Sequence, residues 1–268
     1  MLGPRRIALS LPSFARLYST PAKDSLAGTV AYHEAYILLH TRHPPTVYPK
    51  RVPSKLQRNL QFLASQWGGI VNHSWSPEQP VHPKFADSGT AEWDAGEGQE
   101  AYYVTAFSRA RGRLELPEVT MDNLEEVNEI LHRHATPSSE QPFKHDGIRH
   151  LYVCTHAERD CRCGETGGQV YDALRSEVAR RGLANQIKVG AVAHVGGHKY
   201  AGNLLVYPDG EWLGQLHAEH VSGILDALME RQIQVDLASS PLCPPFWRGR
   251  MGLDKEEQLN LIASATSS

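Results

Sequence analysis

Two short segments of the chain carry residue types that bind metals or do redox chemistry. Three of the four cysteines fall within ten residues, at Cys154, Cys161 and Cys163. The second segment, HVGGHKYAGN at 194–203, holds two histidines four residues apart, His194 and His198. Thiolates and imidazoles are common protein ligands of transition metals. Together the two segments indicate a metal or redox site.

The histidine pair does not fit a helix, although its spacing is helical. On a helix, residues four apart lie on the same face. Gly196 and Gly197 stand between the two histidines, and glycine disfavours a helix by about 1 kcal/mol relative to alanine. We expect a glycine-rich loop instead, placed by the elements that flank it.

The elements expected around the two segments would bring them together in space. The pattern of apolar and turn-forming residues predicts a strand, a helix and a second strand, at 149–155, 167–183 and 186–194. The strands of such a unit are parallel, with a right-handed crossover. Their carboxyl ends emerge at one edge of the sheet, where ligands bind. Cys154 and His194 stand at these two ends.

The expected ligands at this edge are Cys154, Cys163, His194 and His198. Cys161 competes with Cys163 for its place in this set. In an extended stretch the two side chains would point in opposite directions, so one would face the site and the other would face away. The sequence alone leaves that choice open.

The chain shows the same order of expected elements twice: strand, helix, strand, strand, strand, helix. In the second half, a hairpin at 203–216 and a helix at 217–229 complete the order. The first half has its elements at 35–41, 54–68, 69–75, 101–108, 113–116 and 122–134. Ser54 is the expected N-cap of the first helix, and Asp122 opens the last one with a capping pattern. This order is thioredoxin-like, so we predict an α/β protein with two thioredoxin-like domains in tandem.

The predicted division of the chain follows from this repeat. Residues 25–134 form a thioredoxin-like domain without ligands, because they contain no cysteine and no histidine pair at spacing four. Residues 135–147 are a linker, and residues 148–235 carry the site. Residues 236–268 form an extended tail with a short helix that opens on a capping box. Residues 76–100 are polar and rich in turn formers, so we expect a long surface loop there.

Composition narrows the class of partner. The net charge is −3 and no long basic run occurs, so we do not expect a nucleic-acid partner. No apolar run reaches the roughly 18 residues of a membrane span. The uneven spacing of the cysteines does not fit a secreted disulfide framework. The oligomeric state has no signature in the sequence.

The first 24 residues are typical of a mitochondrial presequence. Their basic residues are Arg5, Arg6, Arg16 and Lys23, and the first acidic residue is Asp24. Arginine, serine and apolar residues without acids are the usual composition of such presequences. We therefore expect import into mitochondria, with the matrix favoured over the intermembrane space.

Three segments resemble the sucrase/ferredoxin-like family, a branch of the thioredoxin-like [2Fe–2S] ferredoxins that includes mitochondrial altered-inheritance-of-mitochondria proteins. They are VCTHAERDCRCGETG, HVGGHKYAGNLLVYPDGEW and FWRGRMGLDKEEQ. The resemblance implies that the second domain is a thioredoxin-like ferredoxin, with a [2Fe–2S] cluster held by Cys154, Cys163, His194 and His198. Relatives with all-thiolate ligation have Cys-x3-Cys where this chain has His-x3-His. Cys161 would then be an extra thiol, and Trp247-Arg248-Gly249 a family signature without assigned chemistry.

Three functions are consistent with these residues. The leading interpretation is a one-electron carrier or redox sensor rather than a stand-alone enzyme. Its electrons would come from an unidentified redox protein partner, because no Gly-x-Gly-x-x-Gly follows a strand to bind a nicotinamide or flavin. A thiol oxidoreductase would use Cys154, Cys161 and Cys163, but a Cys-x-x-Cys is missing. A structural Cys2His2 zinc site would use the same four ligands as the cluster.

Overall fold

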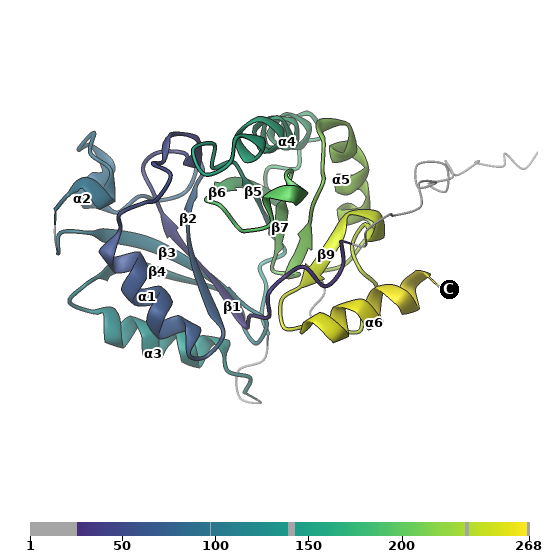
Figure 1. Ribbon diagram of the computed structural model, residues 1–268, viewed down its shortest axis with the longest axis horizontal. Coiled ribbons are helices and arrows are strands. Elements are labelled where there is room, and N and C mark those ends of the chain that lie inside the picture. Colours follow the sequence, from purple (N-terminus) through teal and green to yellow (C-terminus); the bar gives the residue numbers. More distant parts are fainter. Residues whose placement is uncertain (1–25, 97, 139–142, 234–235, 267–268) are drawn as a thin grey trace, which may run out of the picture.

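The computed structural model (Figure 1) describes residues 26–96, 98–138, 143–233 and 236–266. The predicted presequence, residues 1–24, lies outside the described residues. Among the helices in the described part of the chain, none has the length and apolar character needed to cross a membrane.

The first half of the chain follows the predicted order of elements. Its strands and main helices are β1 (Ala35–His40), α1 (Lys55–Ser65), β2 (Gly69–Trp75), β3 (Ala101–Ser108), β4 (Gly112–Thr120) and α3 (Leu124–Ala135). β1 pairs in parallel with β2 and antiparallel with β3, and β3 pairs antiparallel with β4. Ser54 caps α1 as predicted, because its Oγ accepts a hydrogen bond from the backbone N–H of Gln57 at 2.9 Å.

The second half repeats this pattern of pairing. Its elements are β5 (Arg149–Cys154), α4 (Cys161–Arg180), β6 (Ile187–Val192), β7 (Leu204–Tyr207), β8 (Glu211–Leu213) and α5 (Val221–Met229). β5 pairs in parallel with β6 and antiparallel with β7, and β7 pairs antiparallel with β8. The parallel β5–β6 pair, crossed over by α4, is the unit predicted to bring the two ligand-bearing segments together.

The two halves are parts of one mixed sheet with nine described strands, in the order β4-β3-β1-β2-β6-β5-β7-β8-β9. They join where β2 and β6 pair antiparallel over a short stretch, with Ser74 opposite Val192 and Trp75 opposite Ala191. The ninth strand, β9 (Trp247–Arg250), lies at the far edge beside β8. Because the sheet is continuous, the division into two tandem domains stays a prediction.

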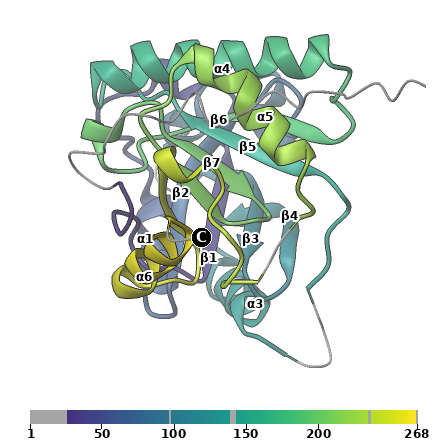
Figure 2. The ribbon, with the colours of Figure 1, turned by 90° about the vertical axis from the view of Figure 1, so that its right-hand side faces the viewer.

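The strands β1 to β4 make up one half of this sheet and β5 to β9 the other, and we call these two parts the half-sheets. Helices cover the outer faces of the half-sheets, and the inner faces of the two half-sheets pack on each other (Figures 1 and 2). One core lies under α1 and α3, and another under α4 and α5. The third core, between the half-sheets, contains Tyr36, Phe107, Tyr152 and Tyr207, and the last of these stacks on Phe107 with ring centres 4.6 Å apart. Strands buried on both faces read as continuous apolar runs, which explains the run AYILLH in β1.

α4 begins earlier than predicted, at Cys161 rather than near residue 167. Asp160 is its N-cap, and the carboxylate accepts a hydrogen bond from the backbone N–H of Arg162 at 3.1 Å. The extended conformation considered for the stretch from Cys161 to Cys163 is therefore wrong, because both cysteines lie in the first turn of a helix.

The glycines in the first turns of α4 make this part of the helix hard to predict from the sequence, yet two of them are required by packing. Glycine is a poor helix former, so the pattern did not predict a helix here. A Cβ on Gly167 would lie 2.1 Å from the carbonyl oxygen of Cys154, and a Cβ on Gly164 would lie 2.6 Å from the Cβ of Ala157. The glycines thus let α4 approach the end of β5 closely.

The start of α3 also differs from the prediction. The helix begins at Leu124, its N-cap is Asn123, and no side chain caps it. The side chain of Asn123 instead accepts a hydrogen bond from the backbone N–H of Thr120 at 2.8 Å, within the preceding turn. The predicted capping by Asp122 is therefore wrong.

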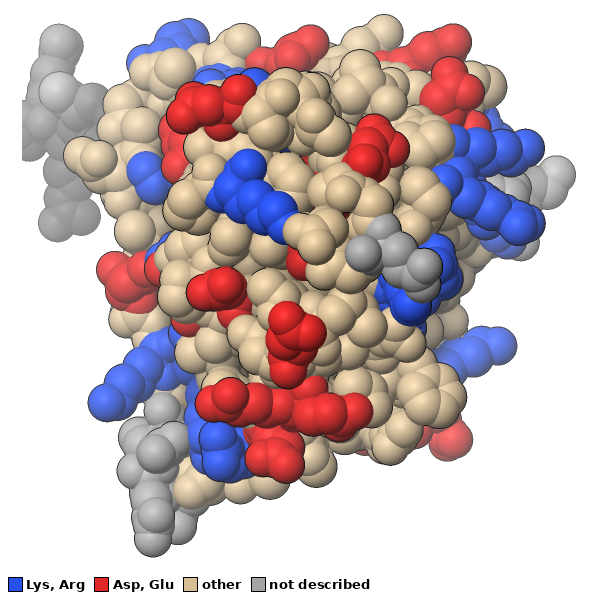
Figure 3. Space-filling model, turned by 90° about the vertical axis from the view of Figure 1, so that its left-hand side faces the viewer, with Lys and Arg blue, Asp and Glu red and all other residues tan. Residues whose placement is uncertain are grey.

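The segment 76–100 is more structured than the predicted surface loop. It contains α2 (Pro83–Ala86) and a 3₁₀ turn at Glu92–Asp94. Glu92 is buried, and its carboxylate accepts a hydrogen bond from the backbone N–H of Arg42 at 2.8 Å. Figure 3 shows the face on the α1, α2 and α3 side, where charges of both signs are spread and acidic side chains gather in the lower part.

The predicted tail contributes to the sheet through β9. The indole N–H of Trp247 donates to the Glu211 carboxylate at 2.5 Å, and the Arg250 guanidinium donates to the same carboxylate at 2.6 Å. This ion pair and hydrogen bond hold β9 against β8, so the segment is a strand rather than only an extended tail.

A last helix, α6 (Lys255–Thr266), follows β9. Asp254 and Glu257 exchange hydrogen bonds between side chain and backbone N–H, at 2.8 and 2.9 Å. This is the capping box that the sequence indicates at this position. Gln258 is buried and donates to the Val30 carbonyl at 3.1 Å, which ties the helix to the first half.

Candidate metal centre

Three of the four predicted ligands lie together at the carboxyl edge of β5 and β6. Cys154 is the last residue of β5, Cys163 lies in the first turn of α4, and His194 follows β6. One ligand atom from each of these residues lies within 4.8 Å of the others. The Sγ of Cys163 is 3.7 Å from Nδ1 of His194. The parallel strand pair thus brings together segments about forty residues apart, as its topology predicts.

The structure shows which of the two neighbouring cysteines, Cys161 or Cys163, faces the site. Cys161 is exposed, whereas Cys163 is fully buried beside Cys154. The helix explains the difference, because residues two apart on a helix point in directions about 200° apart. The remaining cysteine, Cys243, is buried in the core under α4 and α5, outside the Cys154–Cys163–His194 group.

The two buried cysteines are hydrogen-bonded to each other. The thiol of Cys163 donates to Cys154 and thereby lowers the pKa of Cys154, and the backbone N–H groups of Val195 and His156 lower that pKa further. The same hydrogen bond, together with burial, raises the pKa of Cys163. Cys154 is therefore prepared to act as a thiolate, the form that binds metals.

The histidine loop is shaped by its two glycines. Gly196 and Gly197 have φ values of +81° and +68°, in the left-handed region that glycine adopts without strain. His194 and His198 thus lie on a tight loop rather than on a helix face. His198 begins a 3₁₀ turn that ends at Tyr200. The side chain of His198 lies outside the described part of the structure, so its ligand role stays a prediction.

His156 supports this loop, which the sequence did not indicate. His156 is buried, with only 4% of its surface exposed. Its Nδ1 accepts a hydrogen bond from the backbone N–H of His194 at 3.4 Å, and its Nε2 donates to the Pro49 carbonyl at 3.1 Å. Burial lowers the pKa of His156, which favours the neutral ring that these bonds require. Its position two residues after a ligand-bearing strand was the available signal.

The first half forms one wall of the site. A recess of about 470 Å³ lies between the histidine loop and the first half, and its lining includes His194, Gly197, Tyr36 and Asn72. The Asn72 amide donates to the Ala193 carbonyl at 3.2 Å, just before His194, and to the Tyr36 hydroxyl at 2.9 Å. The ligand-free half therefore helps to position the loop that carries the histidines.

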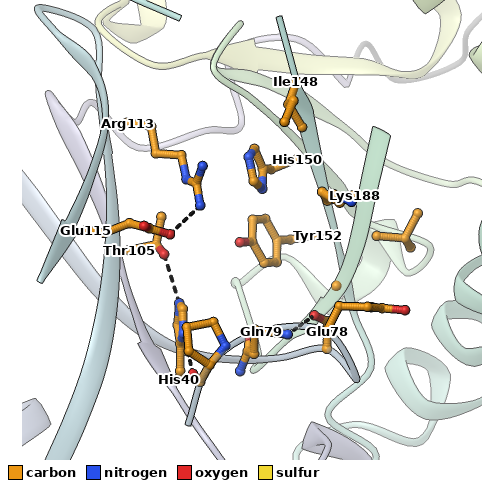
Figure 4. A pocket seen from close by; sticks show the side chains of 14 residues that line it. His40, Glu78, Gln79, Thr105, Arg113, Glu115, Ile148, His150, Tyr152 and Lys188 are labelled. Atoms are coloured by element: carbon orange, nitrogen blue, oxygen red, sulfur yellow. Dashed lines mark hydrogen bonds and ion pairs between the residues drawn. The ribbon is translucent and has the colours of Figure 1, made fainter. Parts of the chain in front are cut away.

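A second cavity, of about 180 Å³, lies between the half-sheets (Figure 4). Its lining contains histidines and carboxylates but no cysteine. His40 pairs with the Thr105 hydroxyl at 2.9 Å, and Arg113 pairs with Glu115. Among the described residues, the ligand atoms that line this cavity do not form a group of three within 4.8 Å of one another, so the cavity does not compete with the Cys154–Cys163–His194 group as a metal site.

The donor set fits a zinc ion or an iron–sulfur cluster. Thiolates and imidazoles are the ligands that both take from proteins. Near the group, the Asn203 side-chain N–H is buried without a partner among the described residues. The carbonyl of the same residue accepts a hydrogen bond from the Cys154 backbone N–H at 3.1 Å. An unpaired buried donor on a residue that is hydrogen-bonded to Cys154 suits a group that brings additional acceptors, such as sulfide.

The chain matches the model of one protein family. The sucrase/ferredoxin-like family matches residues 26–249, and the chain belongs to it. Among named relatives, altered inheritance of mitochondria protein 32 of Clavispora lusitaniae is 27% identical over 245 residues, covering 85% of this chain and 88% of that protein. The protein of the same name from Meyerozyma guilliermondii is 25% identical over 175 residues, which is 61% of this chain. That match spans 59% of the relative's own length.

Two further similarities are shorter. Actin patches distal protein 1 of Saccharomyces cerevisiae is 32% identical over 91 residues, covering 30% of this chain and 29% of that protein. Among solved structures, the thioredoxin-like [2Fe–2S] ferredoxin from Aquifex aeolicus is 20% identical. It covers 31% of this chain and 86% of its own, with a TM-score of 0.28.

Proposed function

We propose that this protein carries a [2Fe–2S] cluster held by Cys154, Cys163, His194 and His198, and that it transfers single electrons or senses redox state. The observation that carries the proposal is the convergence of two buried cysteines and His194 at one sheet edge. Membership of the sucrase/ferredoxin-like family supports the same chemistry. The cluster would supply a one-electron couple, and the chain's own residues would set its position and surroundings.

The surroundings of the ligands differ in a way that suggests where electrons enter. Cys154 and Cys163 are buried, whereas His194 is partly exposed and lines the recess of about 470 Å³. The histidine side is thus the accessible side of the proposed centre. We propose that a redox protein partner approaches there, since the sequence offers no nucleotide-binding motif of its own.

Mitochondrial location is part of the proposal. Its supports are the basic, acid-free segment 1–23 and the names of relatives such as altered inheritance of mitochondria protein 32. We propose the matrix rather than the intermembrane space. Fusion of residues 1–30 to a fluorescent protein, followed by protease protection of isolated mitochondria and mitoplasts, tests both points.

Anaerobic purification with iron, sulfide and zinc analysis tests the cofactor. We expect a red-brown protein with about two irons and two sulfides per chain. A colourless protein with one zinc would establish the structural zinc site in its place. A colourless protein without metal, in which Cys154 and Cys163 cycle between dithiol and disulfide, would establish a thiol oxidoreductase. The Cys243→Ser variant is the matched control, because that buried thiol lies outside the site.

A further inference from the structure

Arg248 is a buried cation beside the metal centre, and its side chain is 2% exposed. One Nη donates to the Asn203 side-chain oxygen at 2.6 Å, while Nε and the other Nη donate to the hydroxyl and carbonyl of Thr29 at 3.1 and 3.0 Å. The guanidinium carbon also lies 4.6 Å from the ring centre of Tyr200. These hydrogen-bond acceptors are all neutral.

The absence of a carboxylate partner sets Arg248 apart from the other arginines that are buried in the described part of the chain. Arg149 pairs with Asp209 at 3.0 Å, and Arg250 pairs with Glu211 at 2.6 Å. Burying an unpaired charge costs several kcal/mol. Burial accordingly lowers the pKa of Arg248 to about 10, while Tyr200 and the Cys154 thiolate oppose that shift. A reduced cluster at the cysteines, which carries a net negative charge, would offset this cost.

Arg248 is linked to both segments that carry the proposed ligands, directly to the histidine segment and through Asn203 to Cys154. Asn203, which it holds through the 2.6 Å bond, accepts the backbone N–H of Cys154 at 3.1 Å. On the histidine loop, a Cβ on Gly197 would lie 2.7 Å from an Nη of Arg248. The guanidinium therefore occupies the space against which the glycine loop closes.

We propose that Arg248 is a positioning residue that holds the histidine loop in place and that its fixed positive charge raises the reduction potential of the cluster. This inference rests on the proposed function. Reduction adds a negative charge to the cluster, and a buried cation nearby stabilises the reduced form more than the oxidised form. Water screens such a charge poorly because it lies in a medium of low dielectric constant.

A packing role alone would make different predictions from a role of the charge. Arg248→Lys keeps the charge and loses the forked hydrogen bonds. Arg248→Gln removes the charge and keeps a polar side chain. Asn203→Asp keeps the shape of the hydrogen-bonded pair but neutralises the guanidinium with a carboxylate. It also removes the side-chain N–H of Asn203, which Arg248→Gln retains, so the two variants are compared with each other. The last two variants cancel the charge by independent routes, so one remains informative where the other does not fold.

The experiment is a redox titration of the cluster-loaded variants, read by visible absorption, with Arg162→Gln as the matched control. Arg162 lies in the first turn of α4 near the cysteines, but it is exposed and pairs with Asp160. We expect Arg248→Gln and Asn203→Asp to lower the ratio of reduced to oxidised protein on the order of tenfold at a fixed potential. For a one-electron couple this is a fall of about 59 mV. Arg248→Lys and Arg162→Gln should stay near the wild-type potential.

Each outcome decides between the two proposals. A wild-type protein without a cluster would overturn the proposed function and this inference with it. A cluster-bearing wild type whose charge-cancelled variants titrate like Arg162→Gln would overturn this inference alone. Loss of the cluster in Arg248→Gln and Asn203→Asp but not in Arg248→Lys would support the charge. Loss of the cluster in all three variants would mean that Arg248 acts only through packing, and it would overturn the proposed effect of its charge on the reduction potential.

Discussion

The carboxyl edges of β1–β2 and β5–β6 lie in halves with the same strand pairing, but among the described residues only the second edge gathers metal-binding groups. His40 ends β1 as Cys154 ends β5. Both ring nitrogens of His40 are engaged, Nδ1 with the Pro80 carbonyl and Nε2 with the Thr105 hydroxyl, each at 2.9 Å. The Sγ of Cys154 instead receives hydrogen bonds that favour its thiolate form.

The segments after the second strands differ in the same sense. After β2, the Gln79 amide folds back and donates to the Ser74 carbonyl at 2.8 Å. After β6, the glycine loop leaves His194 partly exposed beside a recess. The fold thus forms a sheet edge suited to ligand binding in each half. At the edge of β1–β2 the polar side chains are engaged in internal hydrogen bonds, whereas at the edge of β5–β6 the cysteines and His194 are available as metal ligands.

The largest expected effect is the loss of the cluster from the second edge. Cys154→Ser, Cys163→Ser, His194→Ala and His198→Ala should each abolish or strongly destabilise it, because each removes one of four ligands. Cys161→Ser and Cys243→Ser should keep the colour, since these thiols lie outside the site. Iron content and visible absorption after anaerobic purification measure the effect. Bleaching by Cys161→Ser but not by Cys163→Ser would reverse the assignment of the two cysteines.

The convergence at this edge could be predicted from the sequence because it depends on local signals. Apolar runs and turn-forming residues predict the strands β5 and β6. The right-handed crossover between two parallel strands then predicts that their carboxyl ends meet at one edge of the sheet. The choice of Cys163 over Cys161 required the true start of α4, which the glycines obscured. The support from Arg248 depends on contacts with Thr29, 219 positions away in the chain, which no local pattern encodes. The joining of β2 to β6 through two residue pairs is equally non-local.

The next effect concerns the reduction potential. Two neutral imidazoles in place of thiolates change the charge of a [2Fe–2S] centre from about −2 and −3 to about 0 and −1, so adding an electron costs less. Histidine ligation raises potentials to about −150 to +300 mV, against about −400 mV for plant-type clusters. We expect the lower part of the upper window, because His194 is partly exposed. His198→Cys should lower the potential, and a variant that retains its cluster without this shift would argue against ligation by His198.

The potential should also fall as pH rises. The second N–H of a bound imidazole is more acidic when its iron is ferric, so above the oxidised-state pKa reduction takes up a proton. With one proton per electron, the slope is about 59 mV per pH unit. A redox titration from about pH 6 to about pH 10 measures it. A flat profile near the plant-type value would contradict ligation by two histidines.

A smaller effect is expected at the first edge. His40→Ala should leave the iron content unchanged but lower the free energy of unfolding by about 1–3 kcal/mol, because the Thr105 hydroxyl and Pro80 carbonyl lose their partner. Burial lowers the pKa of His40 to about 4. Between about pH 6.5, the usual histidine pKa, and about pH 4, the imidazole of His40 binds a proton more readily in the unfolded chain than in the folded protein. His40 therefore destabilises the fold as pH falls through this window. Urea unfolding at pH 7 and pH 5 should show a smaller acid loss in the variant, and an equal loss would contradict this account.

The smallest expected effects are on stability, and they differ between two neighbouring glycines of α4, Gly167 and Gly168. A Cβ on Gly167 would meet the Cys154 carbonyl oxygen at 2.1 Å, whereas a Cβ on Gly168 would meet nothing within 4 Å. Gly167→Ala should therefore push α4 away from β5, costing about 1–3 kcal/mol and weakening cluster retention. Gly168→Ala should stabilise the protein by about 0.4–1 kcal/mol, because alanine is the better helix former and narrows the unfolded ensemble. Thermal unfolding of both variants, with iron content measured alongside, gives the comparison. Equal effects of the two substitutions would mean that α4 does not need this close approach to hold Cys163 beside Cys154.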